Sequence, residues 1–386
     1  MTAGRAVICS QSNFETDYRV AKMAATLRSC GYDVTLLGRS HPRETRGGGG
    51  GVHYMRLLFW RGPLFYAELN LRLLLHLLFC RRPALIVSID LDTLAGCLLA
   101  SKARGARLMF DSHELFPEVP EIAGKPLVRR VWQRVQDLCV PRMRETDVRV
   151  TVCRSIADIF RSAYGREFLV VRNVPLAARA EAVRRAAATS PCRPFTILYQ
   201  GAVNVGRGVE EVIRALPRLP GCRFVVVGCG DVLDEARRLA ETEGVADRVE
   251  FAGRKPFGQL AQYMAAADLG TVLMRDVCLN YRLALPNRLF DFIQAGLPIL
   301  ASRLPEVERV VDGEGVGLCI GDLTPDAVAA AVRVVMTHPE MAARWRANMA
   351  ALARRQTWEE ETKSLAEALT AGQARNIMGD NGVKVR

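Results

Sequence analysis

Short apolar runs alternate with helical patterns along most of this chain, and this alternation constrains the fold more than any other feature. Residues 6–10 are predicted to form a strand, residues 18–30 a helix, and residues 34–37 a second strand. The same rhythm resumes at residues 195–200. Strands separated by helices pair in parallel, because each helix returns the chain to the same end of the sheet. We therefore expect an α/β protein built on parallel sheets.

The composition and net charge limit which classes of molecule the protein is expected to bind. Hydrophobic residues make up 49% and charged residues 24% of the 386 residues, which is ordinary globular composition. The net charge of +12 is compatible with nucleic acid, an anionic membrane or phosphorylated substrates. The sequence carries no nucleic-acid motif, so nucleic acid is the least favoured of these. The 11 cysteines include no C-x-x-C pair, which argues against a disulfide framework or a zinc site and fits a reducing cytoplasm.

Residues 280–298, NYRLALPNRLFDFIQAGLP, contain the most informative helical pattern. Pro286 stands where a helix would begin, and Gly296 marks its end. An apolar stripe occupies one side, and Asn287, Arg288 and Asp291 are expected on the other. An amide, a guanidinium and a carboxylate together suit a polyhydroxylated, phosphorylated ligand. The structural alternative is an aspartate in a first helical turn that pairs with Arg288.

Residues 201–208, GAVNVGRG, follow a predicted strand and open a predicted helix. A glycine-bearing turn of this kind offers backbone N–H groups to a phosphate, here around Gly201, Gly206 and Gly208. Arg207 adds a fixed positive charge with bidentate geometry. The alternative is a tight turn with a surface arginine. A further G-x-G at residues 228–230 lacks the third glycine of a dinucleotide fingerprint, and we interpret it as ordinary sheet structure.

The sequence DSHELFPEVPE at residues 111–121 follows another predicted strand and is dense in titratable groups. Ligands bind at the carboxyl ends of strands in open α/β sheets, so His113 is a candidate site residue. A D-x-D at residues 90–92 also follows a strand. We give it no metal-binding role, because this spacing is frequent by chance and Asp92 suits the cap of the next helix.

These separate stretches together resemble family 4 glycosyltransferases. Asp291 lies five residues before the glycine of a G-x-P turn, DSHE resembles the D-x-H-E loop of a bacterial branch, and Arg207-Gly208 falls on the Lys-Gly of the family's glycine loop. The resemblance extends over about residues 5–369. It implies transfer of a sugar, with retention, from a nucleoside diphosphate sugar donor to an acceptor, without a metal ion or other cofactor. It also implies that His113 reaches the donor sugar, with Arg207 as the second catalytic group.

The resemblance implies two Rossmann-like domains facing across a cleft, the GT-B type of α/β fold. The acceptor-side domain is expected at residues 1–175 and the nucleotide-sugar-binding domain at residues 195–355. Residues 176–194, rich in alanine and arginine, are the expected linker. A terminal helix at residues 356–372 is expected to cross back to the first domain with Trp358 as an anchor, and residues 373–386 are expected to be disordered.

The chain departs from the family pattern at two positions. Ala202 stands where the family often has an arginine, and Lys255 is a candidate to supply the missing diphosphate contact. Leu283 stands where the family commonly has an acid eight residues before Asp291, and Asn287 with Arg288 are candidates for the lost contacts. The family also places a glutamate after the next strand. The expected donor-binding set is therefore Gly201, Gly206, Gly208, Lys255, Asn287, Arg288, Asp291, Glu306 and Glu308.

Two other classes of function stay open at this point. The same two-domain fold hosts nucleotide-sugar epimerases and hydrolases, which use no acceptor. A catalytically degenerate nucleotide-binding partner is also compatible with the replacements at Ala202 and Leu283. Product sugar that appears free, or tight nucleotide binding without turnover, would favour these classes.

The segment at residues 56–82 raises the question of where the protein works. It combines aromatic residues and leucines with five arginines, and the chain shows no signal peptide and no membrane span. Family 4 enzymes often act on lipid-linked acceptors in surface polysaccharide synthesis. We expect a cytoplasmic protein at the inner face of the inner membrane, in peripheral contact with anionic lipid. The alternative is that the helix at residues 64–80 is a core helix of the N-terminal domain.

Overall fold

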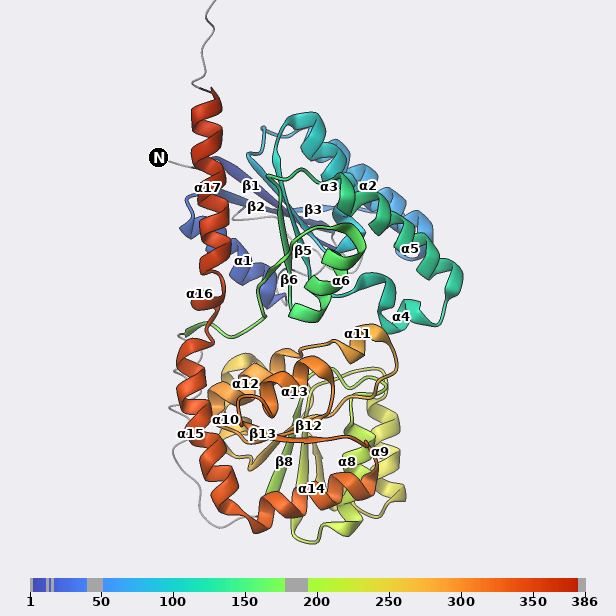
Figure 1. Cartoon of the computed structure of the whole chain (residues 1–386). Coiled ribbons are helices and arrows are strands. Elements are labelled where there is room, and N and C mark those ends of the chain that lie inside the picture. The colour runs from blue at the N-terminus through green and yellow to red at the C-terminus, as the bar shows by residue number, and fades with distance from the viewer. Residues whose placement is uncertain (1–2, 12–13, 15–16, 40–50, 178–193, 381–386) are drawn as a thin grey trace, which may run out of the picture. The chain divides into compact units, whose positions relative to one another are not determined.

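The computed structural model describes residues 3–11, 14, 17–39, 51–177 and 194–380 (Figure 1). The chain forms two compact units. Unit 1 comprises Met1–Asn173 together with Glu361–Arg386, and unit 2 comprises Val174–Glu360. Most of the predicted linker, residues 178–193, lies outside the described residues.

Unit 1 is built on a parallel sheet with strand order β3-β2-β1-β4-β5-β6-β7. The chain runs outward from β1 in one direction and then crosses to β4 in the other, so β1 and β4 flank a point where the strand order reverses. Ligands of open α/β sheets bind beside such a point, at the carboxyl ends of the strands. The strands are β1 (Arg5–Cys9), β2 (Asp33–Arg39), β3 (Val52–Met55), β4 (Leu85–Ile89), β5 (Arg107–Ser112), β6 (Val148–Thr151) and β7 (Leu169–Val170).

The helices of unit 1 cover this sheet. Helix α3 packs closely on α2, where Gly96 meets the backbone of Asn70, and the amide of Asn70 also donates to the carbonyl of Asp92 at 2.7 Å. Helix α2 buries a stripe of four apolar side chains and leaves Leu64, Leu71 and Leu75 exposed. The helices are α1 (Tyr18–Ser29), α2 (Gly62–Phe79), α3 (Leu91–Arg104), η1 (Phe116–Glu118), α4 (Pro120–Ala123), α5 (Pro126–Cys139), η2 (Val140–Arg142), α6 (Arg154–Tyr164) and α17 (Lys363–Asp380).

Unit 2 repeats the parallel arrangement with strand order β10-β9-β8-β11-β12-β13, and the order reverses between β8 and β11. Its strands are β8 (Phe195–Gln200), β9 (Cys222–Val227), β10 (Val249–Phe251), β11 (Leu269–Val272), β12 (Ile299–Ser302) and β13 (Gly317–Ile320). Its helices are α8 (Val209–Ala215), η3 (Leu216–Arg218), α9 (Leu233–Thr242), η4 (Ala246–Arg248), α10 (Phe257–Ala265), α11 (Leu279–Arg282), α12 (Asn287–Ala295), α13 (Pro305–Val311), α14 (Pro325–Thr337), α15 (Pro339–Arg355) and α16 (Trp358–Glu361). The α/β fold class predicted from the alternating pattern is therefore confirmed in both units.

One expectation for the end of the chain is wrong where the structure describes it. Residues 373–380 continue helix α17 and are not a disordered tail, while residues 381–386 of the expected tail lie outside the described residues. Trp358 belongs to unit 2, where it is buried and its backbone N–H donates to the carbonyl of Pro175 at 2.9 Å.

Helix α17 is fixed on unit 1 by its own residues. Leu365 and Leu369 are fully buried. Arg107 at the start of β5 donates to the carbonyls of Ala368 and Leu369 at 3.0 and 3.2 Å. Burial of two leucines supplies most of the docking free energy, because each apolar side chain removed from water contributes about 1.5–3 kcal/mol.

Leu369→Ala should lower the free energy of unfolding of unit 1 by about 2–5 kcal/mol, because it leaves a cavity beneath α17. Hydrogen exchange of peptides from β5 under mild denaturant measures the change. Thr370→Ala, on the exposed side of the same helix, is the matched control. Equal exchange in the two variants would contradict docking through Leu369.

Candidate functional site

The turn between β8 and α8 has the backbone that its glycines predict. Gly201, Gly206 and Gly208 have φ values of 131°, 76° and 80°, in the region that favours glycine. A Cβ on Gly208 would lie 2.4 Å from the Cβ of Leu273. The turn thus needs glycine at Gly208 both for its conformation and for its close approach to the end of β11. Helix α8 has only seven residues, so the turn's chemistry depends mainly on its side chains.

Arg207 lies half-buried in this turn, with its guanidinium 4.2 Å from the centre of the Tyr281 ring. One of its terminal nitrogens donates to the sulfur of Met274 at 3.6 Å. Its Nε is buried and has no hydrogen-bond partner among the described residues. The interpretation as a surface arginine on a tight turn is therefore not supported by its surroundings.

Arg288 stands at the start of α12, which begins after Pro286 and ends at Gly296 in a left-handed conformation, as predicted. Its side chain is 7% exposed, and its guanidinium lies 4.8 Å from the centre of the Tyr199 ring. Its Nε donates to the carbonyl of Thr271 at 3.2 Å, while one Nη is buried without a hydrogen-bond partner in the described chain. Burial lowers the pKa of Arg288, and the positive charge of Arg207 lowers it further.

The two guanidiniums are therefore neighbouring like charges, of which Arg288 is buried and Arg207 is half-buried. No carboxylate of a described residue lies within ion-pairing distance of Arg207 or Arg288, although each retains a buried N–H that donates to nothing. Cations removed from water are costly unless an anion compensates them. The tyrosine rings offset part of this cost, since a cation over an aromatic face is stabilised by about 0.5–2 kcal/mol. The arrangement is thus electrostatically incomplete without a bound anion.

Asp291 and Gly201 connect α12 to the same turn. The amide of Gln200, at the end of β8, donates to Asp291 at 2.9 Å. A Cβ on Gly201 would lie 3.5 Å from a terminal nitrogen of Arg288. The structure therefore brings together the glycine turn, Arg207, Arg288 and Asp291. Asn287 is exposed, so the predicted shared polar side of α12 is wrong for Arg288, which points into the protein.

The remaining donor-binding candidates differ in their surroundings. Glu306 is 4% exposed and pairs with Arg309 at 2.7 Å, whereas Glu308 is half-buried and pairs with Arg303 at 2.5 Å. Glu306 is therefore the buried acid of the two. Lys255 is half-buried in the turn between β10 and α10.

His113 in unit 1 lies at the carboxyl end of β5, as predicted. Its Nε2 is 3.1 Å from Asp111 and its Nδ1 is 3.6 Å from Asp90. Burial lowers the pKa of His113, but the charges of Asp90 and Asp111 outweigh it and raise the pKa to about 9. Asp111 is also held by Arg19 in a buried bidentate pair at 2.7 and 3.2 Å. His113 is thus a fixed cation at neutral pH.

Asp90 was missed as a partner of His113. It has φ 57°, the only positive φ of a non-glycine residue in the part of the chain that the structure describes. One oxygen of Asp90 accepts the backbone N–H of His113 at 2.7 Å. A positive φ in a non-glycine residue is a strained backbone conformation, which persists where surrounding contacts impose it and is typical of functional sites. The cap assignment for Asp92 is wrong, because Asp90 precedes α3 and Asp92 is buried within its first turn.

Comparison with known sequences decides the family. The family model described as "Glycosyl transferase 4-like domain" matches residues 16–177, and the model described as "Glycosyl transferases group 1" matches residues 183–351. Together they cover most of the chain in the expected order. The chain is a family 4 glycosyltransferase. The epimerase interpretation is thereby set aside, and the suspected resemblance is confirmed.

Curated relatives of this glycosyltransferase act in glycan synthesis. The lipopolysaccharide core biosynthesis glycosyltransferase LpsE of Rhizobium meliloti (strain 1021) is 29% identical over 182 residues, which are 46% of this chain and 51% of LpsE. The chain thus matches only about half the length of LpsE. A GDP-mannose-dependent phosphatidylinositol monomannoside mannosyltransferase of Mycobacterium tuberculosis (strain ATCC 25618 / H37Rv) is 28% identical over 284 residues, 68% of this chain and 71% of that protein.

Solved structures show the same fold at low sequence identity. Sucrose-phosphate synthase from Thermosynechococcus elongatus has a TM-score of 0.72 at 17% identity, covering 98% of this glycosyltransferase and 100% of that chain. Anabaena HepE in complex with UDP and glucose has a TM-score of 0.72 at 15% identity, covering 95% and 99%. These similarities confirm the GT-B type of fold.

Asp90→Asn should lower the pKa of His113 from about 9 toward its ordinary value, because it removes a neighbouring negative charge. The midpoint of the His113 ring resonance in an NMR titration measures this, with His113→Asn identifying the resonance. Asp158→Asn, on the surface of α6, is the control.

The raised pKa also fixes the sign of a stability effect. His113 contributes stability that is complete below about pH 6.5, the ordinary pKa of histidine, and that is lost as pH rises through about 9. The stability difference between the wild type and His113→Asn should therefore shrink across this range. A difference that grows with pH would contradict the assigned charge.

Proposed function

We propose that this glycosyltransferase moves a sugar from a nucleoside diphosphate sugar to a lipid-linked glycan acceptor in surface polysaccharide synthesis. The observation that carries the proposal is the pair Arg207 and Arg288, half-buried and buried, which has no anion among the described residues although each has a buried N–H without a partner there. A diphosphate supplies two adjacent negative groups, and guanidiniums bind such oxygens through paired hydrogen bonds.

In this proposal Arg288 takes over the contact that the arginine missing at Ala202 would make. Its guanidinium already lies beside Gly201, the residue before Ala202, and its buried Nη has no other partner. Lys255 is the weaker candidate for this role, because no comparable contact connects it to the turn. Asp291 binds the ribose hydroxyls, since a carboxylate can accept from two vicinal hydroxyls.

The names of related proteins support the donor class. HepE has been crystallised with UDP-glucose, and the mycobacterial relative is GDP-mannose-dependent. Both ligands are nucleoside diphosphate sugars with different bases and sugars. We therefore assign the class of donor and leave its base and sugar to experiment.

The chemistry that we propose centres on the leaving diphosphate. As the bond from the anomeric carbon to the phosphate oxygen breaks, negative charge grows on that oxygen. Arg207 and Arg288 stabilise this charge in a site shielded from water, where it has most effect on rate. In this proposal they do so without a metal ion, and the configuration at the anomeric carbon is retained. His113, as an imidazolium, contacts the donor sugar.

Arg288→Met should weaken binding of the matching nucleoside diphosphate at least tenfold and leave binding of the phosphate-free nucleoside unchanged. Arg207→Ala should lower kcat/KM for transfer by about a hundredfold, typical of losing one charge-stabilising donor. Calorimetry against UDP, GDP, ADP and CMP first identifies the base. Arg238→Met, on the surface of α9, is the control. If the nucleoside binds as well as its diphosphate, the diphosphate assignment is wrong.

Asp291→Asn should weaken donor binding by about 1–3 kcal/mol. The carboxylate can accept hydrogen bonds from both ribose hydroxyls, whereas the neutral amide has only one acceptor oxygen. The comparison of ribose with 2′-deoxyribose nucleotides sharpens the test. The wild type should prefer the ribose form, and the variant should lose this preference. An unchanged preference would place the ribose elsewhere. Tight nucleotide binding without transfer to any acceptor would favour a degenerate partner.

The proposed membrane contact depends on a surface formed by α2, α3 and α5, which we call the α2–α5 face. Helix α3 packs against both neighbours (Figure 1). Large apolar side chains are exposed on all three helices: Leu64, Leu71, Leu75, Phe79, Leu99, Leu127, Val128, Val131 and Leu138. Exposed basic residues accompany them: Arg61, Arg81, Arg82, Lys102, Lys125, Arg130 and Arg134.

This combination fits an anionic lipid surface. Among the described residues no helix is long and apolar enough to cross a membrane. Helices that expose leucine or phenylalanine beside arginine lie in the interface, where each basic residue contributes about 1 kcal/mol. Phe79 is 84% exposed and Leu127 75%, an unusual exposure for such side chains in water. Arg72 contributes less than the sequence implies, because it pairs with Glu68 at 2.7 Å.

Liposome co-sedimentation tests the α2–α5 face. The wild type should bind vesicles that contain phosphatidylglycerol and release them at high salt, since the attraction is screened. Phe79→Ser with Leu127→Ser should weaken binding even at low salt. Val334→Ser with Arg346→Gln, on α14 and α15 of unit 2, is the control. No binding at low salt would exclude membrane attachment and leave the transferase proposal intact.

A further inference from the structure

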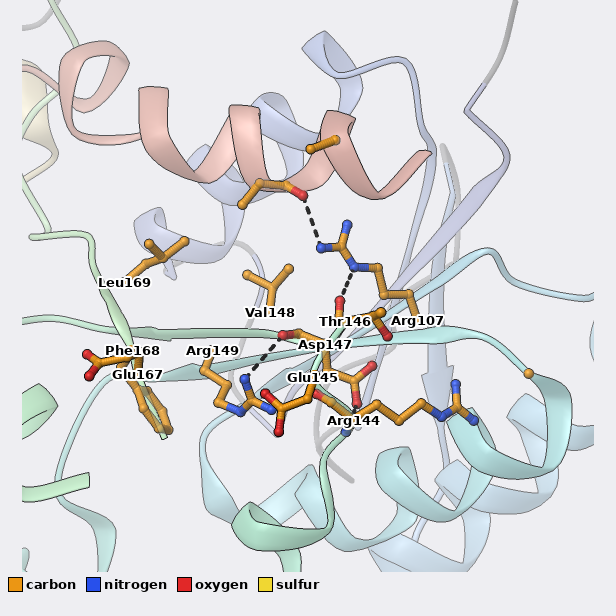
Figure 2. Close-up of a pocket in the computed structure, with 13 residues that line it drawn as sticks. Arg107, Arg144, Glu145, Thr146, Asp147, Val148, Arg149, Glu167, Phe168 and Leu169 are labelled. Atoms are coloured by element: carbon orange, nitrogen blue, oxygen red, sulfur yellow. Dashed lines mark hydrogen bonds between the residues drawn. The ribbon is translucent and has the colours of Figure 1, made fainter. Parts of the chain in front are cut away.

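A cavity lined by several charged residues lies in unit 1 at the end of the sheet opposite His113. It has a volume of about 520 Å³ and opens where β5, β6 and β7 begin (Figure 2). Arg107 at the first residue of β5 lines it, whereas His113 follows the last residue of the same strand. A cavity of this size holds a small metabolite. No role proposed above uses it.

Arg149 forms the charged floor of this cavity. Its side chain is 7% exposed, and its Nε is buried without a hydrogen-bond partner among the described residues. One Nη donates to the carbonyl of Arg144 at 2.6 Å, and the other lies 3.5 Å from the carbonyl of Asp147. Burial lowers the pKa of Arg149, and the charge of Asp147 only partly opposes this. The guanidinium is thus a buried cation held by neutral carbonyls.

The carboxylates that line the cavity are directed to other groups or to solvent. Asp147 accepts the backbone N–H groups of Leu108 at 2.9 Å and of Arg144 at 2.7 Å. Glu145 is 81% exposed and pairs with Arg166. Glu167 is exposed at the rim.

A second guanidinium on the cavity wall also lacks an acidic partner. Arg144 donates to the carbonyls of Ala106 and Ser101 at 3.1 and 3.2 Å and makes no ion pair with a described residue. The two arginines beside this cavity thus donate to neutral backbone carbonyls. Anionic oxygens of a ligand would bind the guanidiniums more strongly, because hydrogen bonds between two charged groups are about twice as strong as those between neutral groups.

We propose that this cavity binds a small phosphate-bearing molecule, with Arg149 as its main anchor. A phosphate in the cavity would compensate the charge of this guanidinium, which is otherwise costly out of water. The ligand would also touch α17, because Ala368 and Ala371 of this helix line the same cavity. A ligand bound in the cavity therefore stabilises the docking of α17 on unit 1, because it contacts both the helix and the strands of the sheet.

Hydrogen exchange on the full chain tests this site. The probes are inorganic phosphate and glucose 1-phosphate, each compared with potassium chloride at equal ionic strength. At ten times the dissociation constant, exchange through opening of α17 should slow about tenfold, because binding to the closed form lowers the population of the open form by that factor. Peptides covering residues 144–149 should slow in parallel.

Two variants separate this cavity from the donor site. Arg149→Met should abolish the protection of α17 while leaving nucleotide binding in unit 2 unchanged. Ala371→Glu should do the same without altering Arg149, since it places a carboxylate on the helical wall. Arg142→Met, outside the cavity, is the control and should retain the protection.

The proposal has clear contrary outcomes. Protection that persists in Arg149→Met would assign phosphate to another site. Protection of residues 201–208 without protection of α17 would show that phosphate binds only at the donor site. Absence of any phosphate-specific protection in the wild type would also overturn the proposal. None of these results bears on the transferase activity.

Discussion

Two neighbouring guanidiniums, one buried and one half-buried, set the main electrostatic constraint in unit 2. Arg207 comes from the glycine turn and Arg288 from α12, and like charges that approach each other out of water destabilise the fold. The rings of Tyr281 and Tyr199 face the two cations and reduce this cost. The glycine turn, the start of α12 at Pro286 and the end of β8 all serve to hold this pair in position.

In unit 1, by contrast, the charge of the candidate site residue is compensated by neighbouring side chains. His113 is charged, but Asp90 and Asp111 compensate it, and Arg19 in turn compensates Asp111. This network is complete without a ligand, and the positive φ of Asp90 shows that the surrounding contacts impose its geometry. A complete network positions a group with little motion, whereas the incomplete pair in unit 2 gains most when an anion arrives. This difference matches the roles proposed above, in which His113 contacts the sugar and the arginine pair binds the charged leaving group.

The sequence predicts those features that depend on neighbours along the chain. The start and end of α12, the glycine turn and the strand that leads to His113 follow from local rules. The burial of Arg288 could not be predicted, because it depends on Tyr199, a residue 89 positions away. The contact between Asp90 and His113 could not be predicted for a similar reason, because the two residues follow different strands.

The positive residues behind the net charge of +12 differ in what they indicate, depending on whether they are exposed or buried. Exposed arginines beside leucines on the α2–α5 face are hydrated and cost little, so they indicate a surface that attracts anions without requiring one. Arg149 and Arg288 are each 7% exposed, and their unpartnered nitrogens lose water without gaining an acceptor. A fold keeps such groups at a loss of stability, and a bound anion is the simplest compensation. The location of an uncompensated cation is therefore a stronger indication of a ligand than the total charge.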